Sequence, residues 1–198
     1  MKTFFCLLML LGCLSVGTTY SQEIKAFNFA ITGGANLSSF TNASTDYRVG
    51  FNAGLKADYY FNKAFFLTSG LYVTQKGGEK KDDYVKFEAN PLYLQLPIYC
   101  GLTSANPEKD IKVSISAGPY IAVGVAGETL YSDNKDKTRT KSKFFDHCER
   151  MDAGVGASFT IQFKQIQFLI GYQYGLVKLH PDFNSHNSSF NAGLAFYL

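Results

Sequence analysis

Apolar residues alternate with polar or small residues along most of this chain, with a period of two. In residues 51–61 the odd positions carry aromatic, leucine or alanine side chains, whereas the even positions include Asn52, Lys56 and Asp58. Residues 190–198 repeat the pattern. Successive side chains of a β-strand point to opposite faces, so each of these segments predicts a strand with one apolar face.

We expect eight such strands, connected alternately by short turns and by longer polar loops. The predicted strands span residues 27–38, 48–61, 64–76, 87–102, 111–127, 149–163, 166–177 and 189–198. Short turns at 62–63, 104–110 and 164–165 alternate with loops at 39–47, 77–86, 128–148 and 178–188. An even number of strands lets the last strand pair with the first, which leaves no open backbone edge inside a bilayer. The predicted fold is therefore all-β, an eight-stranded antiparallel up-and-down transmembrane β-barrel.

The composition of the two strand faces indicates which one meets lipid. The apolar face carries no charge, and Ser69 is almost its only polar side chain. A lysine or arginine at the middle of a bilayer costs about 2–4 kcal/mol, so this purity is expected of a lipid-facing surface. The other face is made of glycine and small neutral polar residues, with charge at Lys56, Asp58, Lys76, Lys112, Asp152 and a few other positions. A soluble, lipocalin-like periplasmic barrel is the less favoured alternative, because its exterior would need more charge.

The start of the chain predicts export. Residues 1–21 read as a signal peptide, with a positive start and an apolar core over Phe4–Leu14, and residues 22–198 as one outer-membrane β-barrel domain. Processing at Cys13, which would leave a lipidated N-terminus, is an alternative. No later stretch has the roughly 20 apolar residues that a membrane helix needs. We expect the outer membrane of a Gram-negative bacterium and no nucleic-acid partner.

Cysteines, prolines and aromatic residues give three further expectations. The predicted topology places Cys100 and Cys148 near opposite ends of the barrel, whereas a disulfide needs Cα atoms within about 7 Å, so we predict separate thiols or an intermolecular bond. Pro97 and Pro119 fall inside predicted strands and lack a backbone donor, so we expect a bulge or bend at each. An aromatic girdle near the short turns is predicted from Tyr59, Phe61, Phe163, Phe168, Phe196 and Tyr197.

The segment Asn90–Ile98, with the sequence NPLYLQLPI, resembles the middle strand of the PorT-like outer-membrane β-barrel family. Other segments similar to that family are Gly33–Ser38, Gly50–Gly54, Gly70–Tyr72 and Asn191–Leu198. Gln95 is neutral where the family usually has an acidic residue. The resemblance implies an outer-membrane barrel and supplies no catalytic residues. Some members resemble components of a protein-export apparatus, a role that we do not extend to this chain.

The last strand also resembles an assembly signal, which implies outer-membrane assembly machinery as a partner. Its polar, glycine, aromatic and final hydrophobic positions are Asn191, Gly193, Phe196 and Leu198. Any final barrel strand would look similar, and both interpretations predict the same location.

Charged residues on the polar face are predicted to meet inside the lumen. The candidates are Lys56 and Asp58 on one strand and Arg150 and Asp152 on another. Isolated buried charges are costly, so these groups must pair or form hydrogen bonds. We interpret them as a structural plug, with a small binding site or a proton path as the alternative. Eight strands enclose room for side chains and not for an open aqueous channel.

The longest predicted loop is basic. Its cations are Lys135, Lys137, Arg139, Lys141 and Lys143. Lysines near an anionic membrane surface contribute about 1 kcal/mol each, so outer-membrane lipid or lipopolysaccharide is a candidate partner. An unknown protein or surface ligand at the outer loops is another, and a merely solvated loop is the simplest interpretation.

The sequence favours a non-enzymatic barrel with a structural or surface-binding role and no cofactor or metal. The alternative is a lipid-modifying enzyme that resembles lipid A deacylases. Such enzymes need a base beside a nucleophile, and His186 and Ser188 are the candidates, with Asp182 nearby in sequence.

Overall fold

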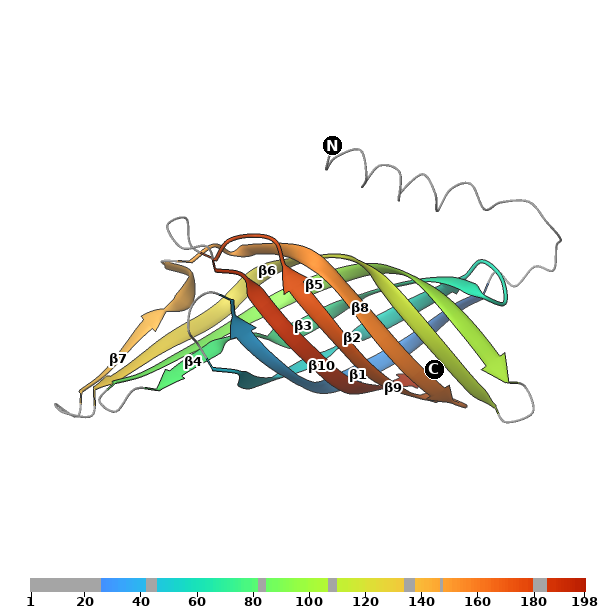
Figure 1. Ribbon diagram of the computed structural model, residues 1–198, viewed down its shortest axis with the longest axis horizontal. Helices are drawn as coiled ribbons and strands as arrows, with labels where there is room; N and C mark the ends of the chain where they lie inside the picture. Colours follow the sequence, from blue (N-terminus) through green and yellow to red (C-terminus); the bar gives the residue numbers. More distant parts are fainter. Residues whose placement is uncertain are drawn as a thin grey trace, which may run out of the picture.

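The computed structural model describes residues 26–41, 46–81, 85–106, 110–133, 138–146, 148–179 and 185–198, which form ten strands and one short 3₁₀ helix (Figure 1). The elements are β1 (Ala26–Phe40), β2 (Arg48–Tyr60), β3 (Phe65–Gln75), β4 (Gly78–Lys81), β5 (Val85–Asn106), β6 (Ile111–Asp133), β7 (Thr138–Lys143), η1 (Phe144–Asp146), β8 (Met151–Phe163), β9 (Ile166–Gly175) and β10 (Asn187–Tyr197). The predicted signal peptide and Cys13 lie outside the described residues.

Eight of these strands close into a barrel, as predicted. Their order around the wall is β5, β3, β2, β1, β10, β9, β8 and β6, and β6 pairs with β5 to complete the circle. Every neighbouring pair is antiparallel. The first and last strands join along a continuous ladder from Ala30 opposite Tyr197 to Phe40 opposite Asn187. Closure through this seam removes the free backbone edge that lipid cannot satisfy.

The strands β4 and β7 lie in segments that the sequence predicts as loops. β5 and β6 are 22 and 23 residues long and continue beyond the barrel wall. β4 pairs with the start of β5 and β7 with the end of β6, so four strands extend the wall on one side (Figure 1). We call this part, formed by β4, β7, 85–91 of β5 and 127–133 of β6, the projecting sheet.

Exposure alternates along the wall strands in the sense expected for a membrane barrel. β8 shows the pattern clearly, because Val155 and Phe159 are exposed while Asp152 and Thr160 are buried. Aliphatic side chains on the outer face are exposed; Leu55, for example, is 62% exposed. The outward face is therefore apolar and the inward face polar, which confirms the predicted orientation.

Neither Pro97 nor Pro119 carries a bulge, so that part of the expectation is wrong. Pairing is interrupted near both residues, but the register between β5 and β6 is the same on either side of them. The shift in register lies instead between Leu92 and Tyr93. The Ser69 hydroxyl donates to the Pro97 carbonyl at 2.8 Å, at the point where the ladder between β3 and β5 is interrupted. That bond also satisfies the rare polar side chain on the lipid-facing side.

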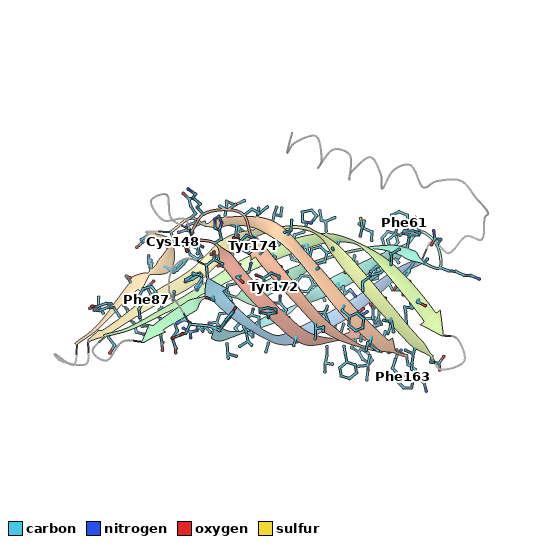
Figure 2. The ribbon with its side chains drawn as sticks, viewed as in Figure 1. Phe61, Phe87, Cys148, Phe163, Tyr172 and Tyr174 are labelled. Carbon is cyan, nitrogen blue, oxygen red and sulfur yellow. The ribbon has the colours of Figure 1, made fainter. Side chains whose placement is uncertain are left out.

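The aromatic girdle at the short-turn end includes the exposed side chains Phe61, Phe163, Phe168 and Phe196. Figure 2 shows Phe61 and Phe163 at this end, opposite the projecting sheet. Tyr197 is a correction, because its side chain is only 6% exposed and points into the lumen. The structure adds a second outward aromatic group near the loop end, where Tyr172 and Tyr47 flank the Phe190 ring at 4.6 and 6.4 Å. Aromatic residues at two levels are typical of a barrel held between two membrane interfaces.

Candidate functional site: the lumen and the loop end of the barrel

The turn-end cluster consists of Lys56, Asp58, Gln167 and Tyr197, which meet inside the lumen near the short turns. The Lys56 ammonium lies 3.0 Å from the Asp58 carboxylate and donates to Gln167 Oε1 at 2.7 Å and to the Tyr197 hydroxyl at 2.9 Å. Tyr197 in turn donates to Asp58 Oδ2 at 2.6 Å. Lys56 and Asp58 stand two residues apart on β2 and so share a face, while Gln167 and Tyr197 come from β9 and β10. These bonds tie the last strand to the second one through the lumen.

The loop-end cluster consists of Lys76, Tyr120, Asp152 and Asn187, at the opposite end of the barrel. The Lys76 ammonium lies 3.0 Å from Asp152 Oδ2, and both side chains are almost completely buried. The same carboxylate oxygen accepts bonds from the Tyr120 hydroxyl at 3.2 Å and from Asn187 Nδ2 at 3.0 Å. Burial of a single carboxylate here is possible because three donors converge on it.

Arg150 does not join this cluster, which corrects the expectation that it pairs with Asp152 in the lumen. The Arg150 side chain is exposed, and its guanidinium lies 5.7 Å from the centre of the Phe145 ring. Strand β8 begins at Met151, so Arg150 precedes the alternation that turns Asp152 inward. Lys76 takes the place predicted for Arg150. The alternation along the strand places Lys76 on the polar face and so predicts that it points into the lumen. Its pairing with Asp152 of β8 depends on distances across the lumen that no sequence pattern encodes.

The middle of the lumen is filled by polar side chains around a small cavity of about 80 Å³. Tyr72, Gln95, Tyr99 and Gln173 are among its lining residues, and Gln173 donates to the Tyr99 hydroxyl at 3.0 Å. Pockets for small-molecule ligands are usually about 300–1,000 Å³, so this space suits a few water molecules at most.

An apolar group, which we call the mouth cluster, covers the loop end of the lumen. Its buried members are Phe40, Ala89, Phe144 and Leu179, and Phe87, Phe145 and Cys148 pack against them. Figure 2 shows Phe87 and Cys148 at this end. Phe145 of η1 makes an edge contact with the ring of Tyr93 at 5.6 Å, directly above the loop-end cluster. Burial raises the pKa of the Cys148 thiol. Among the described residues, no disulfide joins Cys148 to Cys100. Cys100 lies exposed on β5.

The contacts of His186 and Ser188 point away from a base and nucleophile pair. His186 Nδ1 lies 3.2 Å from the Val177 carbonyl, and the ring stacks on Tyr174 at 5.9 Å. The Ser188 hydroxyl lies 3.0 Å from the Tyr172 hydroxyl. Neither contact links the ring to the hydroxyl. Asp182 lies outside the described residues.

The remaining candidates are dispersed. Lys135 and Lys137 lie outside the described residues, Arg139 is in β7, and Lys141 and Lys143 are exposed on β7. Lys141 lies 3.7 Å from Glu128 across the β6–β7 ladder. The predicted assembly residues lie in β10 and at its end. Asn191 and Gly193 are on the lumen side, and Phe196 and Leu198 are on the exposed side.

Two general features of the described part complete the description of possible sites. It contains no group of three or more His, Cys, Asp or Glu side chains that could hold a metal ion. It also contains no helix that is long and apolar enough to cross a membrane.

Comparison with solved structures finds similar barrels at low sequence identity. They include the attachment invasion locus protein Ail of Yersinia pestis, with 14% identity over 86% of this chain and 98% of that chain and a TM-score of 0.47. Neisserial surface protein A has 13% identity over 85% and 96% of the two chains and a TM-score of 0.49. The N-terminal barrel of OprF of Pseudomonas aeruginosa has 14% identity over 85% and 97%, with a TM-score of 0.35.

No curated protein matches the sequence. A sequence profile described as the outer membrane protein beta-barrel domain does match, over residues 20–180. This match spans nearly all of the wall strands that close the barrel and carry its apolar exterior. The protein is therefore an outer-membrane protein, and the chain belongs to the outer membrane protein beta-barrel domain family.

Proposed function

We propose that this protein is a non-enzymatic, non-conducting barrel that anchors the projecting sheet in the outer membrane and presents it as a binding surface. The sealed lumen carries the proposal. Two buried ion-pair clusters and the mouth cluster lie in series along the barrel axis, with a cavity of about 80 Å³ in the lumen. A barrel filled in this way leaves no passage for solutes through its lumen, so any partner would bind at its exterior.

The length of β5 and β6 supports a role for the projecting sheet. A bilayer-spanning strand needs about 9–11 residues, whereas these strands have 22 and 23. The additional residues raise the sheet beyond the wall, where β4 and β7 widen it (Figure 1). Exposed residues on a rigid scaffold of this kind are suited to binding.

Outer-membrane lipopolysaccharide is the partner that we propose for β7. Lys141 and Lys143 stand at alternate positions and so share one face of the strand. Their attraction to phosphate should be weakened by salt. Binding of the purified protein to lipopolysaccharide aggregates at increasing salt tests this proposal, and a double Lys141→Gln, Lys143→Gln variant should bind more weakly. Equal binding by the variant would leave a surface protein as the candidate partner.

We also propose two finer assignments. The motif at Asn90–Ile98 supports a PorT-like subfamily within the family, and the pattern of Asn191, Gly193, Phe196 and Leu198 supports recognition by outer-membrane assembly machinery. Replacing Phe196 with alanine should reduce the amount of folded protein in the membrane. Replacing the equally exposed Phe190, which lies outside the pattern, should reduce it less.

Recordings across a planar lipid bilayer test the absence of a pore. The purified protein should give no stepwise conductance, whereas discrete steps would contradict a sealed lumen. A second measurement addresses the lipid-modifying alternative. Cells producing the wild type and Ser188→Ala should show the same lipid A acylation by mass spectrometry, and a difference between them would make the protein an enzyme.

A further inference from the structure

Lys76 sits in a site with the chemistry of an ammonium receptor. Its Nζ lies 3.0 Å from Asp152 Oδ2, 4.4 Å from the centre of the Tyr120 ring and 5.5 Å from that of Tyr93. A carboxylate and two aromatic faces around one point are the groups that bind alkylammonium ions in proteins. Asp152 Oδ1 is buried without a hydrogen-bond partner in the described part of the chain, so the carboxylate is turned toward the ammonium by one oxygen only.

The occupant of this site is part of the chain, and it comes from the base of the projecting sheet. β3 ends at Gln75, and Lys76 and Gly77 lead directly into β4. The backbone N–H of Lys76 donates to the Pro91 carbonyl at 3.0 Å. A Cβ at Gly77 would overlap the carbonyl oxygen of Ala89, so this turn packs directly against β5. The Lys76 side chain therefore holds the point at which the wall becomes the projecting sheet.

The other pair of strands in the projecting sheet reaches the same site. η1 follows β7, and its Phe145 ring contacts Tyr93, one wall of the ammonium site. Its neighbour Phe144 packs with Ala89 of β5 in the mouth cluster. Both flanks of the projecting sheet thus converge on the groups that surround Lys76.

The turn-end cluster provides a natural comparison. Lys56 and Asp58 are also a buried lysine–aspartate pair, but both come from the middle of β2, and their partners lie on β9 and β10. Loss of Lys56 disturbs wall strands that are paired on both sides. Loss of Lys76 removes a side-chain anchor at the start of a short strand, β4, which pairs with β5 and forms a bridge between Glu79 and Asp46.

We infer that Tyr93, Tyr120 and Asp152 form an ammonium-binding site whose built-in ligand, Lys76, latches the projecting sheet to the barrel. The inference deepens the proposed function, on which it rests, because it assigns the conformation of the binding surface to a site inside the lumen. The class of ligand that fits the site is a primary alkylammonium ion.

Hydrogen exchange of the folded protein in lipid nanodiscs tests the latch. In Lys76→Met, amides of β4 and 86–88 of β5 should exchange at least about tenfold faster than in the wild type, because local opening becomes easier. Amides along the β1–β10 seam should be unchanged. The matched variant Lys56→Met should leave β4 and β5 at the wild-type rate. Equal rates in β4 for all three proteins, or equal acceleration by both variants, would overturn the latch.

Chemical rescue tests the ammonium site. Lys76→Ala removes the atoms that n-propylammonium would replace, so this ion should restore slow exchange in β4, whereas propan-1-ol, which lacks the charge, should not. If the variant does not fold without an additive, the yield of folded protein becomes the readout, with the same expected difference. Equal effects of ion and alcohol would overturn the site. Both tests are made without a binding partner, so their failure would count against the latch and not against the proposed function. If Lys76 protects β4 as expected but the protein binds no surface ligand, the result would count against the proposed function and not against the latch.

Discussion

Replacing Asp58 with alanine measures how strongly the turn-end cluster stabilises the barrel. Asp58 is completely buried, and its Oδ2 accepts bonds from the Lys56 ammonium at 3.0 Å and the Tyr197 hydroxyl at 2.6 Å. The variant would leave Lys56 buried with two neutral partners, Gln167 and Tyr197. Breaking a buried pair by removal of one partner costs about 3–5 kcal/mol, and we expect a loss of unfolding free energy in that range.

A double variant separates the charge from the packing. Lys56→Met with Asp58→Leu replaces both charges by apolar groups of similar size, and such replacements are close to neutral or stabilising. The double variant should therefore be more stable than Asp58→Ala by at least about 2 kcal/mol. Thr140→Ala, on the exposed side of β7, serves as the control and should lie within about 0.5 kcal/mol of the wild type.

The assay is urea unfolding of the protein in lipid vesicles. The sequence has no tryptophan, so the folded fraction is best followed by the different gel mobility of unboiled folded and unfolded protein. Equal midpoints for Asp58→Ala and the wild type would refute the reasoning. So would a double variant less stable than Asp58→Ala, because removal of the unpaired charge would then have recovered no stability.

Three further predictions use the same preparation. Gly124→Ala should destabilise the protein by about 1–3 kcal/mol, because the new Cβ would overlap the Phe145 ring, whereas Gly33→Ala, with open space at its Cβ, should be close to neutral in the same titration. Leu55→Arg on the lipid-facing side should cost about 2–4 kcal/mol in vesicles, and a cost below about 0.5 kcal/mol would contradict the assigned membrane face. Burial raises the pKa of the Cys148 thiol, so its thiolate fraction at pH 8 is small. Alkylation of Cys148 by maleimide should therefore be slower than that of an unstructured cysteine and should accelerate as the pH rises. Equal alkylation rates at pH 8 would show that the mouth cluster is open to solvent.

The wall of the barrel could be predicted from the sequence because lipid imposes a strict alternation on it. Outward positions such as Leu55 and Ile170 are apolar and inward positions are small or polar, and this contrast marks each strand independently of its partners. The strand β7 has no such contrast. Its residues 138–143 alternate hydroxyl side chains with cations, so both faces are polar and the segment reads as a loop. Only pairing with the end of β6 shows that it is a strand.

Inside the lumen, the parity of a residue could be predicted but its partner could not. Tyr197 is an even number of residues from Asn191 and Gly193, so it lies on the same face of β10 and points inward. This position in the alternation predicts its orientation better than its aromatic ring, which suggested the outer girdle. The pairing of Lys76 with Asp152 joins residues 76 positions apart across the barrel, and it depends on the stagger of every intervening strand. Arg150 is closer to Asp152 in sequence but lies before the start of β8.

The seam between β1 and β10 has a kinetic consequence. The Tyr197 hydroxyl reaches Asp58 across a separation of 139 residues, so this contact forms only when the whole circuit of strands is in place. Until then Lys56 and Asp58 lie on the face of an open sheet, where lipid would leave both charges unsolvated at a cost of several kcal/mol each. An open sheet carrying these charges has no low-energy position inside a bilayer. Entry into the membrane and closure of the seam must therefore proceed as one concerted event, with the lumen groups kept hydrated until the last strand docks.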